Sequence, residues 1–197
     1  MPSFGADRHT LFYATSGTFG HSSPIASSRR HKFDVMMVAL DDSGAAVGAS
    51  QQLTHQELYD LSSLAISPDG KSFLLSVYRY PAGSMIEEYD VAAPLQVKKT
   101  FQPHVPHEVS SGAIFGSAAY AHDGVGIVFL AASGGGTFDY NVYQVSDVTG
   151  SNLVALTNGT GMAESLNVDR DGTIFFVRDG QRYKLDPKTR AMSKERF

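Results

Sequence analysis

The stretch LAISPDGKSFLLSV, from Leu64 to Val77, predicts a β-strand, a tight Asp-Gly turn and a second, strongly apolar strand. Asp-Gly between β-forming residues is a strong hairpin signal, because glycine tolerates the positive φ that the turn needs. The same pattern recurs in AYAHDGVGIVFLAA from Ala119 and in LNVDRDGTIFFV from Leu166. The chain therefore contains an internal repeat, and this repeat decides the fold.

The spacing of the turns sets the size of the repeating unit. The turn aspartates are Asp69, Asp123 and Asp171, so successive turns lie 54 and 48 residues apart. A weaker copy, FGADRHTLFYAT from Phe4, opens the chain with Asp7 in the turn position. These spacings are slightly longer than a four-stranded propeller blade.

Two further strands follow each hairpin. The third alternates apolar and polar residues, which predicts one buried and one exposed face; these strands begin at Phe33, Met85, Tyr140 and Gln181. The fourth is short and ends at Thr54, Phe101, Thr157 and Phe197, with a Leu-Thr ending in the first and third units. Four strands, four times, predict an all-β chain: one β-propeller domain, 1–197, of four four-stranded antiparallel blades, approximately 1–54, 55–102, 103–158 and 159–197.

Two local features accompany this prediction. The segment Thr54-His55-Gln56-Glu57 fits a helix capping box, from which we expect at most one helical turn between blades. The aromatic residues of the second strands are predicted to form the core between blades; they are Phe12, Tyr13, Phe73, Phe129, Phe175 and Phe176.

The repeat resembles the WD-like repeat of the TolB-type propeller family, which carries a Ser-Pro-Asp-Gly turn before an apolar strand. Ser67-Pro68-Asp69-Gly70 matches this turn in full, and His122-Asp123-Gly124 and Arg170-Asp171-Gly172 match it in part. The resemblance covers nearly the whole chain, although no tryptophan precedes any turn. It implies the propeller fold, and a periplasmic role with envelope partners if it extends to function.

The number of blades leaves the closure of the propeller open. Proteins resembling TolB have six blades and a separate N-terminal domain, whereas four blades are predicted here. We expect the chain to be a part of a larger propeller, one half of a homodimeric ring, or a four-bladed ring. An unclosed propeller would leave its terminal blades with exposed faces and edges.

Composition excludes several classes of partner. The formal net charge is -4, and the longest basic run is Arg29-Arg30-His31-Lys32, which argues against nucleic acid and anionic membranes as partners. The chain has no cysteine, so disulfides and thiolate metal sites are excluded. Apolar runs such as Ile127 to Ala132 are too short to span a bilayer, and the N-terminus has no apolar signal region. We therefore expect no membrane insertion, and the compartment stays open.

Blade topology sorts the loops onto two faces. The first-to-second and third-to-fourth turns share one face, called here the turn face. The second-to-third loops and the links between blades share the other, the loop face. Long loops on a rigid scaffold concentrate binding residues, so we predict a partner-binding site on the loop face that contains His21, Arg29, Arg30, His31, His55, Arg79, His104, His107 and Glu108. The alternative is that polar residues simply collect in solvated loops.

Motifs for other chemistry are weak. His104-Val-Pro-His107-Glu108 lacks the helix that a zinc motif needs, because Pro103 and Pro106 break it. The segment that begins at Asn167 imitates a calcium loop but has Arg178 where a bidentate Glu belongs. Glu87, Glu88 and Asp90 share a strand whose default interpretation is a solvated face. No Gly-x-Ser-x-Gly nucleophile motif occurs. We expect no catalytic residues, no metal and no cofactor.

Two functions from different classes follow. The first is a non-catalytic scaffold that binds a protein or peptide through its loop face or central channel, with a possible homodimer completing the ring. The second is the propeller that gates a serine peptidase of the prolyl oligopeptidase type, whose catalytic domain is not in this chain. Coding sequence that continues past Phe197 into a Gly-x-Ser-x-Gly segment would favour the second. A propeller hydrolase or lyase that uses channel-lining His and Asp is a weaker third hypothesis.

Overall fold

The structure is a computed structural model that describes residues 2–16, 33–55, 61–107, 112–122, 124, 126–133, 138–147 and 149–195. Over these ranges the chain forms strands, turns and bends, and no α-helix occurs among them. A search of the same residues found no helix that could cross a membrane.

Four antiparallel sheets of four strands succeed one another, each with its strands in sequence order. Blade 1 comprises β1 (Pro2–Phe4), β2 (Thr10–Ser16), β3 (Phe33–Leu40) and β4 (Ala46–Gln52). Blade 2 comprises β5 (Leu61–Ile66), β6 (Ser72–Arg79), β7 (Gly83–Asp90) and β8 (Ala93–Phe101). Blade 3 comprises β9 (Ile114–Tyr120), β10 (Ile127–Ala132), β11 (Asn141–Val145) and β12 (Val154–Ala155). Blade 4 comprises β13 (Ala163–Val168), β14 (Ile174–Arg178), β15 (Gln181–Leu185) and β16 (Met192–Lys194).

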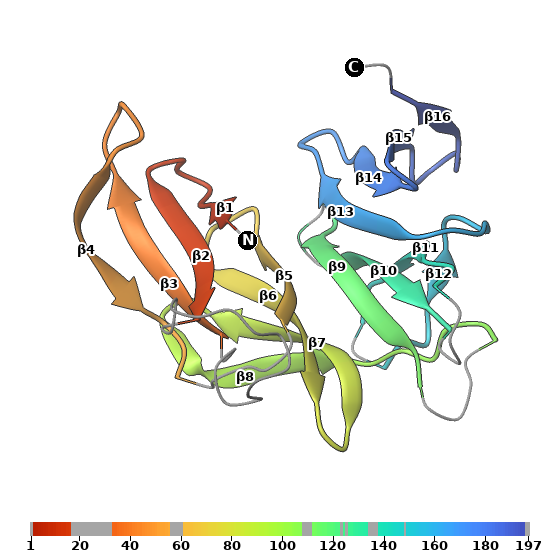
Figure 1. The fold of residues 1–197 in the computed structure, drawn as a ribbon, viewed down its shortest axis with the longest axis horizontal. Helices are drawn as coiled ribbons and strands as arrows, with labels where there is room; N and C mark the ends of the chain where they lie inside the picture. Colours follow the sequence, from red (N-terminus) through yellow and green to blue (C-terminus); the bar gives the residue numbers. More distant parts are fainter. Residues whose placement is uncertain are drawn as a thin grey trace.

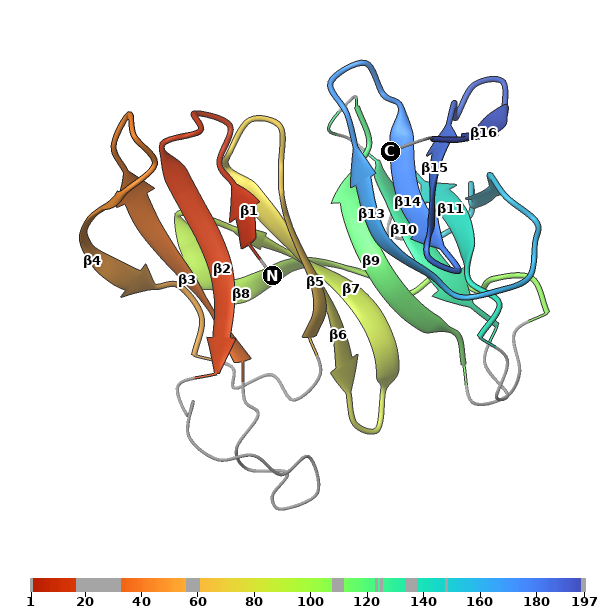
Figure 2. The ribbon, with the colours of Figure 1, turned by 45° about the horizontal axis from the view of Figure 1, so that its top comes forward.

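The sheets follow one another around an arc, with the first strand of each blade on the inner side (Figure 1, Figure 2). Among the inner strands, β5 lies against β1 and β9, and β9 lies against β13. The predicted all-β propeller of four four-stranded antiparallel blades is confirmed. A blade in the middle of the chain is therefore covered on both faces by its neighbouring blades, and a blade at either end is covered on one face.

The hydrophobic core lies between the blades. One cluster joins blades 1 and 2 through residues such as Phe12, Val35 and Phe73. A second joins blades 2 and 3, and a third joins blades 3 and 4. For each blade we call the face toward the next blade in the chain the front face, and the face toward the preceding blade the back face.

The predicted aromatic core is confirmed at four positions and wrong at two. Phe12, Phe73, Phe129 and Phe176 are at most 3% exposed. Tyr13 and Phe175 are only partly buried. Their strand neighbours Phe12 and Phe176 pack against blades 2 and 3, so Tyr13 and Phe175 point to the back of blade 1 and the front of blade 4. Neither of these faces has a neighbouring blade in this chain.

The alternation predicted for the third strands is wrong in blade 2. Strand β7 is buried over six successive residues, and Glu87 and Glu88 are 3% and 5% exposed. The solvated-face interpretation of these glutamates is therefore wrong, because a central blade packs on both sides. Each carboxylate has cationic partners instead: Glu87 pairs with Arg79, and Glu88 pairs with Lys98 and Lys99 at 3.3 and 3.2 Å.

The Leu-Thr endings of blades 1 and 3 form one repeated local structure. The Thr54 hydroxyl accepts a hydrogen bond from the backbone N–H of Val35 at 2.9 Å, and the Thr157 hydroxyl accepts one from Val142 at the same distance. Each hydroxyl also donates to the side chain before that valine, Asp34 or Asn141. The hydroxyl of Thr54 thus fastens the link to β3; residues 56–60, where the helical turn was expected, lie outside the described residues.

The Asp-Gly turns overlap from blade to blade. A Cβ on Gly70 would lie 3.5 Å from Ala6, and one on Gly172 would lie 3.3 Å from His122. Gly70 and Gly172 also have positive φ, which L side chains rarely adopt. Glycine is therefore needed at both positions for the turn; the preceding blade is in ordinary van der Waals distance at Gly70 and closer at Gly172.

Candidate functional site

The structure describes four of the nine residues predicted for the loop face. His55, Arg79, His104 and His107 are described, whereas His21, Arg29, Arg30, His31 and Glu108 lie outside the described residues. His55, His104 and His107 are exposed. No group of three or more potential metal ligands of the His, Cys, Asp or Glu type occurs among the described residues. Participation of the nine residues in partner binding stays a prediction.

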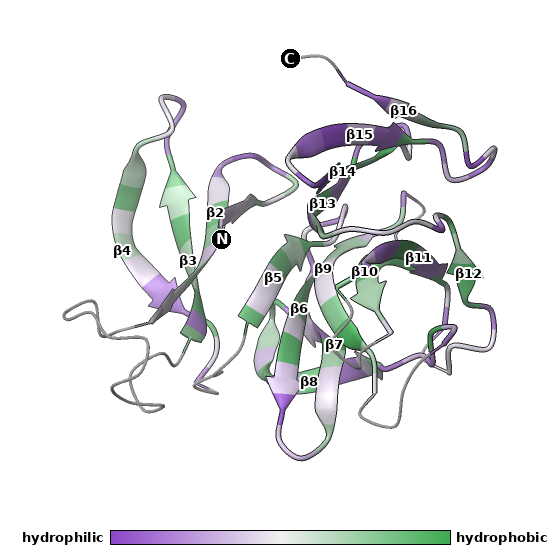
Figure 3. Ribbon diagram, turned by 45° about the vertical axis from the view of Figure 1, so that its right-hand side comes forward, coloured by the Kyte–Doolittle hydropathy of each residue, from purple (hydrophilic) through white to green (hydrophobic). Residues whose placement is uncertain are grey.

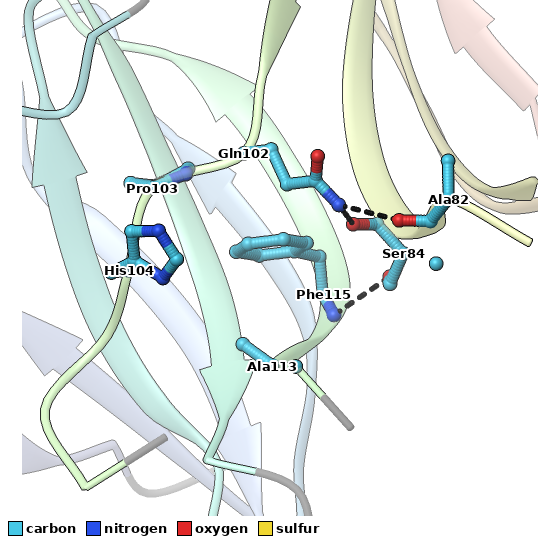
Figure 4. A pocket seen from close by; sticks show the side chains of 9 residues that line it. Ala82, Ser84, Gln102, Pro103, His104, Ala113 and Phe115 are labelled. Atoms are coloured by element: carbon cyan, nitrogen blue, oxygen red, sulfur yellow. Dashed lines mark hydrogen bonds between the residues drawn. The ribbon is translucent and has the colours of Figure 1, made fainter. Parts of the chain in front are cut away.

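His104 lines a small cavity of about 210 Å³ between blades 2 and 3 (Figure 4). The cavity lies where the β6–β7 turn meets the link from β8 to β9, as the loop-face topology predicts. Gln102 joins these segments, because its Nε2 donates to the carbonyls of Ala82 and Ser84 at 2.9 and 3.1 Å. Ser84 Oγ accepts the backbone N–H of Phe115 at 3.0 Å. Much of the polar lining is thus used to hold the two blades together.

Arg79 has a structural role between blades 1 and 2. Its Nε and Nη2 donate to both carboxylate oxygens of Glu87, each at 2.7 Å, and Nη2 also donates to the Tyr89 hydroxyl at 3.1 Å. The hydrogen bond to Glu87 is the main cause that raises the pKa of Arg79. Such a bidentate pair fixes side-chain orientation. Arg79 therefore orders the interface of blades 1 and 2, and its part in partner binding stays a prediction.

A much larger depression runs along the inner side of the arc. It has a volume of about 1080 Å³, and we call it the central groove. Residues from the first strand and following turn of all four blades line it: 2–6 and 8, 62–68, 117–122, and 164–170. The fold thus brings together four segments that are about 50 residues apart in sequence.

β-Bulges shape the wall of the central groove. The pairing of β5 with β6 shifts at Ser62, the pairing of β9 with β10 shifts at Gly116 and Ser117, and the pairing of β13 with β14 shifts after Glu164. Bulges re-aim side chains and occur often beside functional sites. Here they place Ser62, Ser117 and Ser165 in the lining of the groove. Ser165 has φ of 56°, a left-handed conformation that is uncommon for serine.

The inner strands also offer backbone groups. Each of β1, β5, β9 and β13 is the first strand of its sheet and pairs with one described strand only. The free edge of a strand presents N–H and C=O groups that an extended peptide can pair with. Hydroxyls of the bulged serines and the exposed side chains of Glu164 and Asn167 lie beside these edges. The groove wall is thus rich in hydrogen-bonding groups.

The turn end of the groove differs from its wall. Arg8, His122, Asp169 and Arg170 line it there. Asp69 and Asp171 form local hydrogen bonds instead: the Ser67 hydroxyl and the N–H of Lys71 donate to Asp69 and lower its pKa, and the N–H of Thr173 donates to Asp171 at 2.9 Å. The turn end of the groove therefore has two guanidinium groups, one imidazole and one carboxylate, whereas Asp69 and Asp171 stabilise the turns.

The groove serines were not predicted from the sequence. Ser62, Ser117 and Ser165 lie 55 and 48 residues apart, nearly the spacing of the turn aspartates. A small polar residue recurring before each turn was therefore a usable signal. It was hidden because serine is common in strands and loops alike, and because a bulge cannot be recognised from alternation alone.

Solved structures with a similar fold include two proteins described as TolB and a hydrolase. TolB from Acinetobacter baumannii is similar with a TM-score of 0.68 and 19% identity, over 98% of this chain and 42% of that chain. A protein described as TolB from Agrobacterium tumefaciens has a TM-score of 0.68 and 16% identity, over 97% of this chain and 62% of that one. Puromycin hydrolase has a TM-score of 0.65 and 16% identity, over 100% of this chain and 30% of that one.

No protein-family model and no curated protein matches the sequence. The chain spans less than two thirds of the length of each of the three structures named above. Identities this low show the fold alone. The chain has a TolB-type β-propeller fold, so the resemblance first indicated by the Ser-Pro-Asp-Gly repeat is confirmed at the level of architecture.

Proposed function

We propose that this chain is a non-catalytic scaffold that binds an extended segment of a protein or peptide partner in its central groove. The observation that carries the proposal is the lining of the groove: inner strands of four blades, with free edges and bulged serines, enclose about 1080 Å³. A volume of this size accommodates several residues of an extended chain.

Recognition would rest on two kinds of contact. Backbone groups of the partner pair with the free edge of an inner strand, which gives affinity without strict dependence on sequence. Ser117 and Ser165 then supply hydroxyls, whereas the Ser62 hydroxyl already donates to the carbonyls of Ser76 and Phe115. Glu164 lies at the loop-face end of β13, and two arginines, Arg8 and Arg170, lie with one carboxylate, Asp169, at the turn-face end. This arrangement favours a partner segment that carries a cationic group toward the loop face and an anionic group toward the turn face.

Peptide display tests this proposal. A random peptide library is selected on the purified chain, and selected peptides are measured by fluorescence anisotropy against wild type and Ser62→Trp. Ser62 is exposed in the groove, so a bulky ring there should weaken binding by about tenfold or more, roughly the cost of blocking one good contact region. Gln51→Trp, an exposed position on the outer strand β4, is the matched control.

The loop face has its own variants. His55→Ala, His104→Ala and His107→Ala remove the three described histidines predicted to contact a partner. If the selected peptides lose affinity for these variants but bind Ser62→Trp normally, the binding site lies on the loop face, and the proposal that the groove binds the partner is wrong. Selection that yields no peptide dependent on either region would contradict the scaffold proposal as a whole.

A second candidate is the gating propeller of a serine peptidase, and the likeness to puromycin hydrolase favours it. The chain would then work beside a hydrolase domain and control access to it. Native copurification followed by mass spectrometry distinguishes the two candidates. A stable partner that carries a Gly-x-Ser-x-Gly nucleophile supports gating, whereas partners without such a domain support the scaffold.

A further inference from the structure

We propose that a second copy of this chain docks head-to-tail on the first, with the front face of blade 4 against the back face of blade 1. The proposal concerns the two sheet faces that have no neighbouring blade in this chain. It rests on a comparison of equivalent positions in the four blades, defined by the pairing of second and third strands.

Blade 4 has cations at two front-face positions of its third strand where the other three blades have none. The pairs Ala14–Val35, Ser76–Ile86 and Leu130–Val142 are equivalent to Val177–Arg182. The third-strand member is 0% exposed in blades 1 to 3, whereas the Arg182 side chain is 41% exposed. One step along, Lys184 stands where blades 1 to 3 have Met37, Glu88 and Gln144. Figure 3 shows the hydrophilic colouring of β15.

Blade 1 has the complementary acid on its back face. Thr15–Asp34 is equivalent to Val77–Met85, Ala131–Asn141 and Arg178–Gln181, so only blade 1 has a carboxylate at this position of the third strand. Beside Asp34 on the same face lie Tyr13, Met36 and Val38, whose equivalents in blades 2 and 3 are all buried. The back of blade 1 thus combines apolar and aromatic side chains with one carboxylate, which accepts hydrogen bonds from Thr54 and Gln52.

The contact between blades 3 and 4 serves as a template for the docking. Arg178, on the back of blade 4, donates from Nη2 to the Tyr140 carbonyl at 2.8 Å and to Asn141 Oδ1 at 3.3 Å, beside Val142. Arg178 pairs with Gln181 on the neighbouring strand, and Gln181 is the equivalent of Asp34. Arg178 lies beside Val142, and Val142 is the equivalent of Arg182. If blade 1 of one copy docks on blade 4 of the other in the same way, Asp34 therefore lies level with Arg182. Arg182 already pairs with Glu195 at 2.9 Å on this face, so Arg182 and Lys184 together leave one excess positive charge on the front of blade 4, level with Asp34 on the back of blade 1.

One pair opposes the contact. Successive turns place Ala6 against Gly70 and His122 against Gly172, so the repeated contact would place Arg170 of one copy against Arg8 of the other. Arg8 has φ of 60°, close to the 73° of Gly70. Arg8→Gly removes this repulsion and supplies the residue that the other turns have at this position. It should therefore strengthen association.

Sedimentation equilibrium of the whole purified chain tests the proposal. We expect a dimer at about 0.1 M salt whose dissociation constant rises by about tenfold or more at about 1 M salt, because the Debye length falls from about 10 Å to about 3 Å. A heterologous contact forms a ring if its rotation closes, and two copies would give eight blades. A larger head-to-tail oligomer at low salt supports the same contact.

Charge reversal makes the test specific. Asp34→Lys alone and the double variant Arg182→Glu with Lys184→Glu alone should each be monomeric, because each places like charges across the contact. An equimolar mixture of these two variants has opposite charges at both contacts and should associate again. Lys71→Glu, an exposed change on the turn of blade 2, is the control for net charge.

Two results would overturn the proposal. Wild type and Arg8→Gly that stay monomeric at about 0.1 M salt up to about 100 μM, well above the range of stable homodimers, would make the front of blade 4 a solvated cap of the kind that ends other repeat proteins. A dimer that persists in both charge variants would use a different surface. Circular dichroism of each variant separates loss of association from loss of folding.

Discussion

The two central blades and the two end blades share one strand pattern but differ in how many of their faces are buried. Strand β10 is buried at every residue, and β6 is buried at its first six. Strand β14 of blade 4 alternates between buried and partly buried residues, and only Phe12 is fully buried among the described side chains of β2. The same hairpin thus has two packed faces in the middle of the arc and one at its ends.

The difference shows where the stability of this fold resides. Each hydrophobic cluster lies between two blades, so no blade has a core of its own. In such a repeat, stability is close to a sum of contacts between neighbours. A residue at the same position of the repeat should therefore matter more in blade 2 or 3 than on the free faces of blades 1 and 4.

The largest expected effect compares Phe129 with Tyr13, which are equivalent back-face positions. Phe129 is 0% exposed and contacts the rings of Phe115 and Tyr143, with centroids 5.5 and 5.8 Å away. We expect Phe129→Ala to lower the free energy of unfolding by about 3–5 kcal/mol, since it removes a buried ring and leaves a cavity. Tyr13→Ala should cost about 1 kcal/mol or less.

Urea unfolding followed by tyrosine fluorescence and circular dichroism measures both variants. Phe129→Leu, which keeps most of the buried volume, should recover much of the loss. Equal losses for Phe129→Ala and Tyr13→Ala in the monomer would show that the back of blade 1 is as fully packed as an internal face, and the comparison between central and end blades would be wrong.

The second comparison concerns ion pairs. Glu87 lies in the interface of blades 1 and 2 with a side chain 4% exposed, and Arg79, its partner, is 33% exposed. Glu195 pairs with Arg182 at 2.9 Å on the free face of blade 4, and both side chains are at least one-third exposed. Glu87→Ala should cost about 3 kcal/mol, because a cation loses its partner in a buried site. Glu195→Ala should cost less than about 1 kcal/mol.

The Tyr89 hydroxyl provides a control for the buried site. It donates to Glu87 Oε2 at 2.6 Å, so Glu87→Gln keeps a hydrogen-bond acceptor for Tyr89 while removing the charge. A loss for Glu87→Gln well below that for Glu87→Ala would assign part of the effect to Tyr89. Similar small losses for Glu87→Ala and Glu195→Ala, measured by urea unfolding, would show that the interface of blades 1 and 2 is well hydrated.

The fold was predictable because its signals are local and repeated. Asp69-Gly70 fixes a hairpin by its own turn chemistry, and recurrence at similar spacing identifies the blades. The burial of Glu87 and Glu88 was not predictable, because it depends on the neighbouring blades and on the cations Arg79, Lys98 and Lys99. A pattern of alternation describes one sheet face at a time, whereas a central blade has two packed faces.

The candidate site was less predictable than the fold. The polarity of the loops predicted a site with histidines such as His104. The wall of the groove is formed by bulges instead, and bulges depend on how two strands pair. Ser62 and Ser165 acquire their positions only when β5 and β13 pair out of register with β6 and β14. Such a shift is a property of two strands together, and one strand's sequence does not encode it.

The smallest expected effect compares two turn carboxylates on exposed turns. The Ser67 hydroxyl lowers the pKa of Asp69 in blade 2 below its ordinary value of 3.8. The N–H of Thr173 lowers the pKa of Asp171 in blade 4, where the charge of Lys184 on the free front face also contributes. Both carboxylates favour the folded state when ionised. Their contribution is therefore present above about pH 4 and lost as the pH falls through the lowered pKa values.

Carboxyl NMR titration of the monomer resolves these two groups. We expect Lys184→Ala to raise the pKa of Asp171 and to leave that of Asp69 unchanged, because the charge of Lys184 lowers the pKa of Asp171. Lys71→Ala should raise the pKa of Asp69 and leave that of Asp171 unchanged, because the charge of Lys71 lowers the pKa of Asp69. High salt should reproduce the change at Asp171 only in part, because the hydrogen bond from Thr173 is not screened. If the pKa of Asp171 does not change in Lys184→Ala, then charges on the front face of blade 4 do not affect the turn of that blade. The charge argument for that face would then lose its support.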